Sequence, residues 1–577
     1  MSALLWVTDL HVGFGRSPGN NEVVKGVSFE LAAGETLAIV GESGSGKSVT
    51  ALSINRLIDF SGGRITRGSI RLARSDGAEL DITKAAESDL IHVRGRDIGM
   101  IFQEPMTSLN PVHTVGAQIE EAFTLNRGLT GRAATLAARE ALDRVRIPDA
   151  AQRLKYYPHQ LSGGMRQRVM IAIAIASNPR LLIADEPTTA LDVTVQAQIM
   201  ALLAELKAET GMAMIFITHD IGLVAGIADT IMVMQGCIAV EQGKLNDVLD
   251  RPQHDYTRHL LNAVPHFNNG RAVRVDGQRA AITSPIVTVD NLVVRFPVAR
   301  RLFRANAGAV HAVDGVDFDL RRGETLAIVG ESGSGKSTTA RALLGLTKAL
   351  RGRVDIASGR SRRPVQMVFQ DPFASLNPRL DVEGLLAEPA VAAGQRIGDT
   401  LRERMTFLLG RVGLPVDALT RYPHQFSGGQ RQRLCIARAL MLNPDVVVLD
   451  EAVSALDVSV QAKVLDLLID LQKEFGLAYL FISHDMAVVE RIAHRVAVMY
   501  AGQIVEIGDA AAVLSGPQHS YTKRLIAAVP AIERRKERFT VDATQVPSLV
   551  RAPGFEPPPA AWRDAGTDHR VRVEASA

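Results

Sequence analysis

The chain has 577 residues, a formal net charge of +3 and 46% hydrophobic residues. This balance predicts several sizeable cores and excludes the strongly basic surface that is typical of nucleic-acid-binding proteins. Its two cysteines, Cys237 and Cys435, are too few for a disulfide framework and suit a reducing cytoplasm. The N-terminus does not resemble a signal peptide, and the apolar run at Val169–Ala176 is far shorter than the roughly 20 residues of a membrane helix. We therefore expect a soluble chain that can still dock on a membrane protein.

The first motif is a glycine-rich loop after a short apolar stretch. TLAIV at Thr36–Val40 predicts a buried strand, and GESGSGKS follows directly at Gly41–Ser48. This spacing fits the loop G-x-x-x-x-G-K-[ST], whose backbone N–H groups and following helix N-terminus face phosphate oxygens. Lys47 is expected to reach the β- and γ-phosphates, and the hydroxyl of Ser48 to ligate Mg²⁺. The residues expected to hold the nucleotide are Gly41, Ser43, Gly44, Ser45, Gly46, Lys47 and Ser48.

Three further strands are predicted to end in polar side chains suited to phosphate chemistry. LLIADEP delivers Asp185 for Mg²⁺ and Glu186 to orient or deprotonate the attacking water. MIFITHD leads to His219, whose imidazole is expected to sense the γ-phosphate. MIF leads to Gln103, whose amide is expected to bridge a Mg²⁺-bound or attacking water. Taken alone, these residues also fit a helix-capping acid pair, a structural histidine and a surface glutamine.

LSGGMRQR at Leu161–Arg168 predicts a second anion site. Ser162, Gly163 and Gly164 precede a helical run, so their N–H groups and the helix N-terminus would face an anion. For a single copy, an ordinary helix cap is the simpler interpretation.

All of these patterns occur twice. GETLAIVGESGSGKS at Gly34–Ser48 returns unchanged at Gly323–Ser337. The two lysines lie 289 positions apart (336 − 47) and the aspartates 265 (450 − 185), so the second copy is trimmed between the loop and the glutamine, mainly in one β-rich region. A tandem duplication of a roughly 250-residue domain explains this and favours the phosphate-site interpretation throughout. The second set is Gly330, Ser332, Gly333, Ser334, Gly335, Lys336, Ser337, Gln370, Ser427, Gly428, Gly429, Gln430, Asp450, Glu451 and His484.

Each domain thus carries two candidate phosphate-binding surfaces. The economical arrangement is head to tail, so that the glycine-rich loop of one domain and the Ser-Gly-Gly of the other close on the same ATP. Lys47 is then expected to face FSGGQ and Lys336 to face LSGGM, which gives two composite sites.

Composition predicts the domain boundaries. We expect a first nucleotide-binding domain at 1–264, a polar linker at 265–284 and a second domain at 285–540. The Pro-rich tail at 541–577 is expected to be irregular or mobile.

In this order and twice over, the motifs resemble those of the ABC ATPase family. The resemblance implies an α/β fold of tandem P-loop NTPase domains. Each would have a RecA-like mixed sheet core, an antiparallel β subdomain and a helical signature subdomain. It also implies that the TALD and SALD stretches place Asp192 and Asp457 at the nucleotide, and that Phe14 and Phe296 stack on adenine.

Several longer motifs resemble those of the oligopeptide/dipeptide importer subfamily. They are FQEPMTSLNP, YPHQLSGG and the closing stretches PQHDYTRHLLNAVP and PQHSYTKRLIAAVP. The resemblance implies an ATPase that drives import of peptides or related small solutes from the cytoplasmic face of the bacterial inner membrane. Its partners would be two separate permease subunits, which provide the only membrane contact, and an extracytoplasmic solute-binding protein.

Three departures from the subfamily matter. Neither linker nor tail contains cysteine, so no iron–sulfur cluster is expected. Met165 replaces the signature glutamine in the first half, and Ala452 replaces the proline after Glu451, without removing a catalytic group.

The alternative is a soluble ABC ATPase that acts on ribosomes or nucleic acid. Such proteins usually carry a long charged helical linker or zinc-binding cysteines, and this sequence has neither. We therefore expect no nucleic-acid partner.

Overall fold

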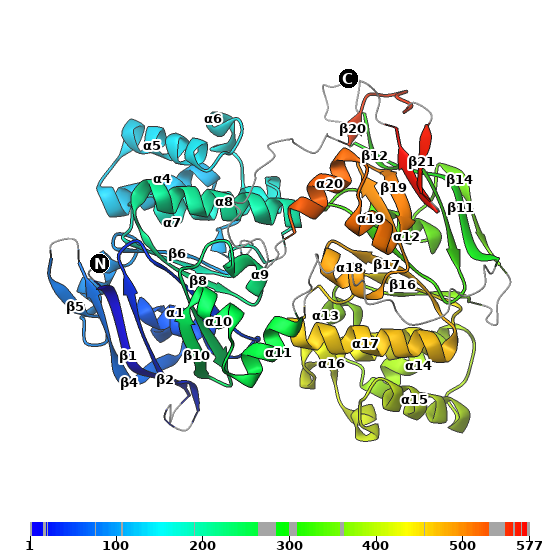
Figure 1. Ribbon diagram of the computed structural model, residues 1–577, viewed down its shortest axis with the longest axis horizontal. Coiled ribbons are helices and arrows are strands. Elements are labelled where there is room, and N and C mark those ends of the chain that lie inside the picture. Colours follow the sequence, from blue (N-terminus) through cyan, green and yellow to red (C-terminus); the bar gives the residue numbers. More distant parts are fainter. Residues whose placement is uncertain are drawn as a thin grey trace. The chain divides into compact units, whose positions relative to one another are not determined.

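The computed structural model describes residues 3–15, 19, 21–74, 77–104, 108–189, 191–263, 284–298, 308–357, 363–454, 456–529, 549–557, 560–566 and 568–573. The chain separates into two compact units, drawn in Figure 1. The first consists mainly of Met1–Leu191 and Val195–Val264, and the second of Pro265–Val529 and Asp542–Ala577. Of the predicted linker at 265–284, only residue 284 is described.

The first unit combines a mixed sheet, an antiparallel sheet and a group of helices. The six-stranded sheet has the order β10-β9-β3-β8-β7-β6, and the antiparallel sheet the order β2-β1-β4-β5. In Figure 1, helices α4 to α7 gather at one end of the unit. The elements are β1 (Ala3–Phe14), β2 (Glu22–Ala32), β3 (Thr36–Val40), α1 (Lys47–Ile54), η2 (Leu57–Ser61), β4 (Gly63–Ala73), β5 (Glu79–Asp81), α2 (Glu87–Val93), β6 (Ile98–Ile101), α4 (Val115–Arg127), α5 (Gly131–Arg144), α6 (Ala150–Arg153), η3 (Pro158–Gln160), α7 (Gly163–Ile175), β7 (Leu181–Asp185), α8 (Val193–Thr210), β8 (Ala213–Thr218), α9 (Ile221–Val224), β9 (Thr230–Gln235), β10 (Ile238–Lys244), α10 (Leu245–Asp250) and α11 (Asp255–Ala263).

The central strands are parallel and buried on both faces. β3 pairs in parallel with β8 and β9, and β7 with β6 and β8, whereas β10 pairs antiparallel with β9. Every residue of β3, β7 and β8 is buried, because helices cover parallel sheets on both sides. This explains why these strands read as continuous apolar runs.

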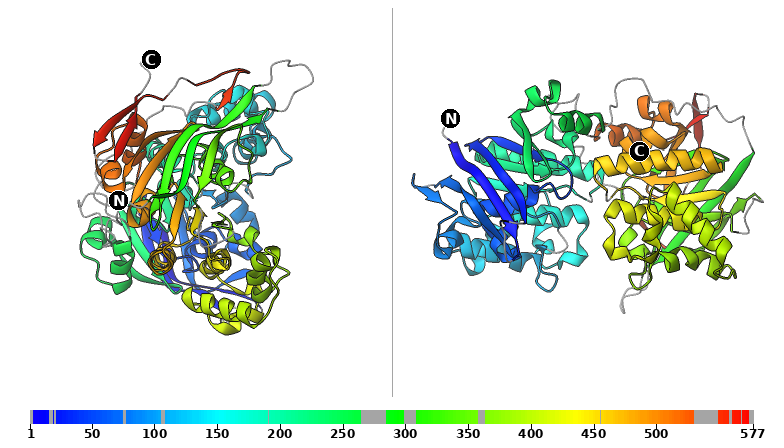
Figure 2. Two further views of the ribbon diagram at one scale, coloured as in Figure 1. Left: turned by 90° about the vertical axis from the view of Figure 1, so that its right-hand side faces the viewer. Right: turned by 90° about the horizontal axis from the view of Figure 1, so that it is seen from below.

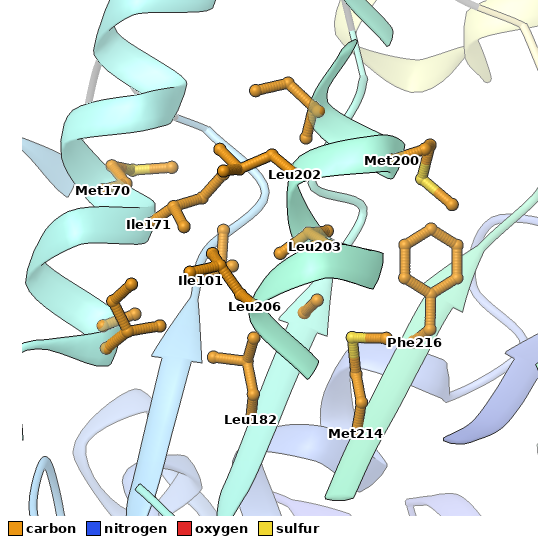
Figure 3. Packing of buried hydrophobic residues seen from close by; sticks show 14 of the residues in the cluster. Ile101, Met170, Ile171, Leu182, Met200, Leu202, Leu203, Leu206, Met214 and Phe216 are labelled. Atoms are coloured by element: carbon orange, nitrogen blue, oxygen red, sulfur yellow. The ribbon is translucent and has the colours of Figure 1, made fainter. Parts of the chain in front are cut away.

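One hydrophobic cluster fixes the strand ends that carry the polar residues. Figure 3 shows side chains of α7 and α8 meeting those of β6, β7 and β8. The labelled residues are Ile101, Met170, Ile171, Leu182, Met200, Leu202, Leu203, Leu206, Met214 and Phe216. Such close packing resists displacement, so Asp185 at the end of β7 is held by a rigid scaffold.

The second unit repeats this architecture with a shorter β-rich region. Its antiparallel sheet has the order β14-β11-β12-β20, and its mixed sheet the order β15-β16-β17-β13-β18-β19-β22-β21. The elements are β11 (Pro285–Pro297), β12 (Ala309–Arg321), β13 (Thr325–Val329), α12 (Lys336–Leu343), β14 (Arg351–Ile356), β15 (Val365–Val368), α13 (Pro372–Ser375), α14 (Val382–Ala392), α15 (Asp399–Arg411), η4 (Val416–Thr420), η5 (Pro423–Gln425), α16 (Gly428–Leu440), β16 (Val446–Asp450), α17 (Val458–Phe475), β17 (Ala478–Ser483), α18 (Met486–Ile492), β18 (Arg495–Tyr500), β19 (Gln503–Asp509), α19 (Ala510–Ser515), α20 (Ser520–Ala527), β20 (Val550–Arg551), β21 (Trp562–Gly566) and β22 (His569–Arg572).

Together these features confirm the predicted fold class of RecA-like mixed sheets, antiparallel β subdomains and helical subdomains. β14 has 6 residues where β4 has 11, in the region that the sequence comparison identified as trimmed. Within the described residues, no helix is both long and apolar enough to cross a membrane.

The expectation of an irregular tail is wrong for part of the tail. β20 pairs with β12, and the hairpin β21–β22 adds to the edge of β19. The red hairpin lies beside the orange β19 in Figure 1 and again in Figure 2. The prolines that suggested irregular structure, Pro553 and Pro557–Pro559, lie between β20 and β21. Pro553 and Pro557 therefore lie outside both ladders, and the edge of β19 pairs with β22, the second strand of the hairpin.

A histidine of this hairpin contacts a buried carboxylate in the core of the second unit. His569 Nε2 lies 2.7 Å from Glu506 Oε1, and the residue Glu506 is 0% exposed. This carboxylate also accepts from the backbone N–H groups of Gln518 and His519, at 2.8 and 2.9 Å. A buried carboxylate that loses a hydrogen-bond donor is destabilised.

We expect His569→Ala to destabilise the second unit by about 1–3 kcal/mol. The chain has two tryptophans, Trp6 in β1 and Trp562 in β21, so Trp562 fluorescence in a Trp6→Phe background reports on this unit. The thermal midpoint should fall for His569→Ala and stay unchanged for the exposed control Arg563→Ala. An unchanged midpoint for His569→Ala would show that the contact contributes nothing.

Candidate functional site

Each glycine-rich loop leads from a central strand into a helix. Gly46 and Gly335 begin α1 and α12 with left-handed backbones, φ 96° and 108°. A Cβ atom at these positions would lie 2.5 Å from the carbonyl oxygen of Val23 and 2.2 Å from that of Ala312. Only glycine fits such a conformation and approach, so the sequence pattern is a structural requirement of the loop.

The loop lysines are buried and held by the loop itself. Lys47 Nζ donates to the carbonyl oxygens of Gly41 and Glu42 at 2.8 Å each. Lys336 Nζ donates to those of Gly330 and Glu331 at 2.7 and 2.8 Å. Burial lowers the pKa of Lys336, which nearby carboxylates partly offset. A fixed ammonium group inside a loop of N–H groups suits the oxygens of a polyphosphate.

The loop serines contact the aspartates that end the neighbouring strands. Ser48 Oγ donates to Asp185 Oδ1 at 3.1 Å, and Ser337 Oγ to Asp450 Oδ1 at 2.8 Å. Burial raises the pKa of Asp185 to about 6, and it raises the pKa of Asp450 as well. A hydroxyl beside a buried carboxylate provides the hard oxygen donors that Mg²⁺ prefers, so these residues fit the predicted metal.

The glutamates that follow have an unusual backbone conformation. Glu186 has φ 45° and Glu451 φ 47°, in the left-handed region that non-glycine residues rarely adopt. Their N–H groups donate to the carbonyl oxygens of Ile217 and Ile482 at 2.9 and 3.0 Å. Strain held by packed strands is found most often at functional sites, and here it occurs in both copies.

Each glutamate carboxylate joins the predicted glutamine and histidine. Gln103 Nε2 donates to Glu186 Oε2 at 2.9 Å, and His219 Nδ1 lies 3.3 Å from Glu186 Oε1. In the second unit the corresponding distances are 2.7 Å from Gln370 to Glu451 and 3.3 Å from His484 to Glu451. The sequence placed these residues at the ends of separate strands, and the structure brings both sets together.

Electrostatics keep these carboxylates ionised. Burial opposes the charge of Glu186, but the hydrogen bond and charge of His219, helped by Thr189 and Lys47, lower its pKa to about 2. The pKa of Glu451 is lowered in the same way through His484. Burial disfavours the charged imidazoles, yet their glutamate partners raise the pKa of both His219 and His484. A carboxylate that stays ionised can accept a hydrogen bond from a water and so orient it.

Thr189 is a contact that the sequence analysis missed. Its Oγ1 donates to Glu186 Oε2 at 2.8 Å, whereas the corresponding Ser454 Oγ donates to the backbone oxygen of Glu451 at 3.0 Å. The only available signal was its position three residues after the glutamate. The two repeats therefore differ next to this carboxylate.

The Ser-Gly-Gly motifs begin helices, as predicted. Ser162 and Ser427 are the N-caps of α7 and α16, and their Oγ atoms accept from the N–H groups of Met165 and Gln430. Gln430 Oε1 in turn accepts from the N–H of Ser427 at 3.0 Å, which completes a capping box. Met165 has no oxygen to do this, so the substitution changes the start of α7. The anion-binding role of Gly163, Gly164, Gly428 and Gly429 remains a prediction.

For the two aspartates and two phenylalanines that were also predicted to contact nucleotide, we report only their positions in the fold. Asp192 directly precedes α8, and Asp457 is the N-cap of α17. Phe14 and Phe296 occupy the ends of β1 and β11; Phe14 packs against the core, and Phe296 is 43% exposed. Their roles toward nucleotide remain predictions.

A family model described as ABC transporter matches residues 24–189 and 313–454, and one described as the oligopeptide/dipeptide transporter C-terminal region matches 240–286 and 505–556. The glutathione import ATP-binding protein GsiA of Salmonella typhimurium is 49% identical, with 98% of this chain and 96% of the relative covered. GsiA of Escherichia coli is 48% identical over the same shares.

A solved archaeal ribosome recycling factor, in complex with ribosomal stalk protein, aligns with TM-score 0.55 and 20% identity. The alignment covers 85% of this chain and 87% of that one. At this identity the likeness concerns the fold alone.

Proposed function

This chain belongs to the ABC transporter family and is the ATP-hydrolysing subunit of an importer, and from that premise we propose how its residues perform the work. Lys47 and Lys336 hold the nucleotide phosphates with their loops. Glu186 and Glu451 orient and deprotonate the attacking water. The observation that carries this assignment is the Gln–Glu–His contact, which both units form with the same atoms.

The residues around each glutamate support distinct steps. The ionised Glu186 accepts a proton from the water, and the Gln103 amide fixes the carboxylate on one side. The His219 imidazole, held on the other side, donates toward the charge that develops on the phosphate. Ser48 and Asp185, with Ser337 and Asp450, would hold Mg²⁺, which neutralises phosphate charge when bound. We extend the same roles to Gln370, Glu451 and His484.

We further propose two composite ATP sites. The loop of Lys47 is completed by Ser427, Gly428, Gly429 and Gln430, and the loop of Lys336 by Ser162, Gly163 and Gly164. The support is that each unit presents both a phosphate loop and a helix N-terminus that begins with Ser-Gly-Gly. Asp192 and Asp457 would complete these sites, and Phe14 and Phe296 would contact the adenine.

Closure on ATP would supply the mechanical work. Shifting a two-state equilibrium from 1:99 to 99:1 needs about 5.5 kcal/mol of differential binding, and two triphosphates contacted from both sides are a suitable source. Hydrolysis releases the closed state, so permeases attached to the two units would alternate between inward and outward access.

An importer subunit of this family works at the membrane with permeases and a substrate-binding protein. The finer proposal is two separate permeases and a position at the cytoplasmic face of the bacterial inner membrane. A tagged chain purified from detergent-solubilised membranes should retain two permease subunits. Recovery of ribosomes or nucleic acid without permeases would favour the alternative function instead.

We propose short peptides as the cargo, with glutathione as the first candidate. The support is the match to the oligopeptide/dipeptide transporter C-terminal region in both units and the name of the relatives that are 48–49% identical. Glutathione is itself a tripeptide. The test is calorimetry on the partner substrate-binding protein with glutathione and with a set of dipeptides. Binding of neither class would contradict this proposal and leave the ATPase assignment intact.

A further inference from the structure

A tyrosine from the last helix of each repeat contacts the glycine-rich loop. Tyr256 of α11 accepts a hydrogen bond at its hydroxyl from the N–H of Glu42, at 3.1 Å. Tyr521 of α20 accepts one from the N–H of Glu331, at 3.0 Å. Both tyrosines are buried, 9% and 2% exposed. The contact recurs in both compact units, so it is a feature of the repeat.

Each tyrosine is held in place by a network of its own. In the first unit, Glu241 accepts from the N–H groups of Gln253 and His254 at 2.7 and 3.0 Å. His254 Nδ1 then accepts from the N–H of Tyr256 at 3.1 Å. The backbone that carries the tyrosine is therefore anchored on strand β10 before the hydroxyl reaches the loop.

The second unit has the same network and adds a contact between two tyrosine rings. Glu506 of β19 accepts from the N–H of His519, and His519 Nδ1 accepts from the N–H of Tyr521 at 3.1 Å. The Tyr521 ring also stacks on Tyr500, with centroids 4.1 Å apart. A ring fixed on this many sides has little freedom to move its hydroxyl.

The hydroxyl acts on the peptide segment that anchors the loop lysine. Lys47 Nζ binds the carbonyl oxygens of Gly41 and Glu42, while Tyr256 binds the N–H of Glu42. Lys336 and Tyr521 do the same around Glu331. Tyrosine and lysine thus fix the two sides of one short backbone stretch at the entrance to the phosphate loop.

We infer that Tyr256 and Tyr521 are positioning residues that hold the phosphate loops in their ATP-binding conformation. Both lie in the segments that match the oligopeptide/dipeptide transporter C-terminal region, outside the segments that match the ABC transporter model. The importer-specific end of each repeat is therefore a structural part of its ATP site. This inference rests on the proposed phosphate-binding role of the two loops.

The test replaces each hydroxyl in the full-length chain. Tyr256→Phe and Tyr521→Phe leave the ring in place but leave a part-buried N–H at Glu42 and a buried N–H at Glu331 without this acceptor. We expect the Kd of the affected site for Mg²⁺–ATP to rise about threefold to tenfold. The KM for ATP should rise with it, while kcat at saturating ATP changes less than about twofold, because the hydroxyl touches no reacting atom. An unchanged Kd in both variants overturns the inference.

Tyr479→Phe is the matched control. The Tyr479 hydroxyl is buried and donates to the Leu468 carbonyl at 2.9 Å, in the second unit. Losing it should lower the thermal midpoint without changing the Kd for ATP. A general loss of stability would affect all three variants alike, whereas positioning affects only the first two.

Amide hydrogen exchange gives a second readout before any nucleotide is added. The N–H of Glu42 should exchange faster in Tyr256→Phe, and that of Glu331 in Tyr521→Phe, with no change at either position in Tyr479→Phe. Because each tyrosine is tested in its own unit, one folded variant is enough to decide. Unchanged exchange at the matching amide contradicts the inference.

The double variant Lys47→Ala/Lys336→Ala separates this inference from the proposed function. If the double variant retains wild-type ATP binding, the loops do not bind phosphate and the proposed function fails. If the double variant loses ATP binding while both tyrosine variants keep the wild-type Kd, only the positioning role fails.

Discussion

Glu186→Gln and Glu451→Gln, made separately in the assembled transporter, should each lower the steady-state ATPase rate, because each slows hydrolysis at its own site by about a hundredfold. The amide keeps the size of the side chain but cannot take a proton from water. Both glutamates have the same glutamine and histidine partners, so we expect both to be needed. The measurement is phosphate release at saturating Mg²⁺–ATP.

Binding should survive these changes, because neither carboxylate belongs to the phosphate loop. The Kd for ATP should therefore stay near that of the unmodified protein. Glu205→Gln is the control, since Glu205 is an exposed carboxylate paired with Arg146 at the surface of the first unit. If either single catalytic variant leaves the ATPase rate untouched, the reading of two active sites is wrong.

Lys47→Ala and Lys336→Ala should each abolish tight binding at one site. Each lysine is a buried cation with two carbonyl contacts inside its loop. Loss of charged hydrogen bonds to phosphate is worth about 1.5–3 kcal/mol, which corresponds to roughly a tenfold to hundredfold weaker Kd. The measurement is equilibrium binding of radiolabelled ATP.

The exposed Lys244→Ala serves as the control for charge. It should leave both binding events unchanged. If Lys47→Ala or Lys336→Ala still binds ATP at both sites with wild-type affinity, the corresponding loop does not hold the nucleotide.

The sequence predicted the strands and their polar ends well. TLAIV, LLIAD and VVVLD form the buried strands β3, β7 and β16 as expected. Periodicity and repetition gave a strong signal there, because parallel central strands must be apolar throughout. Glu186 was singled out from its position after such a strand, and the structure places it in contact with Gln103 and His219.

Other features of the structure had no local signal in the amino-acid sequence. The left-handed backbone of Glu186 is imposed by the packed strands around it and not by its residue type. β22 pairs with β19 across more than 60 residues of sequence, and pairing between such distant segments leaves little trace in composition. Tyr256 contacts a backbone N–H, and a backbone partner places no requirement on the residue type at Glu42.

The two repeats differ at the start of the Ser-Gly-Gly helices and beside the glutamates. Gln430 completes a capping box at the start of α16, and Met165 cannot do so at α7. Thr189 contacts Glu186, whereas Ser454 contacts only backbone at Glu451. The identical fifteen-residue stretches cannot produce a difference in turnover, so these neighbours are where we expect its origin.

In the proposed composite sites, the Ser-Gly-Gly of the other unit completes each phosphate loop. Aspartate caps helices as well as serine does, so Ser162→Asp and Ser427→Asp should keep α7 and α16 while repelling phosphate. Lys47→Ala combined with Ser427→Asp would damage the same composite site twice. Lys47→Ala combined with Ser162→Asp would damage both sites once.

The decisive measurement is the number of ATP molecules retained per chain in these two double variants. The proposal predicts about one ATP for Lys47→Ala with Ser427→Asp, and none for Lys47→Ala with Ser162→Asp. The reverse result would mean that each loop is completed within its own unit, which would contradict the composite sites.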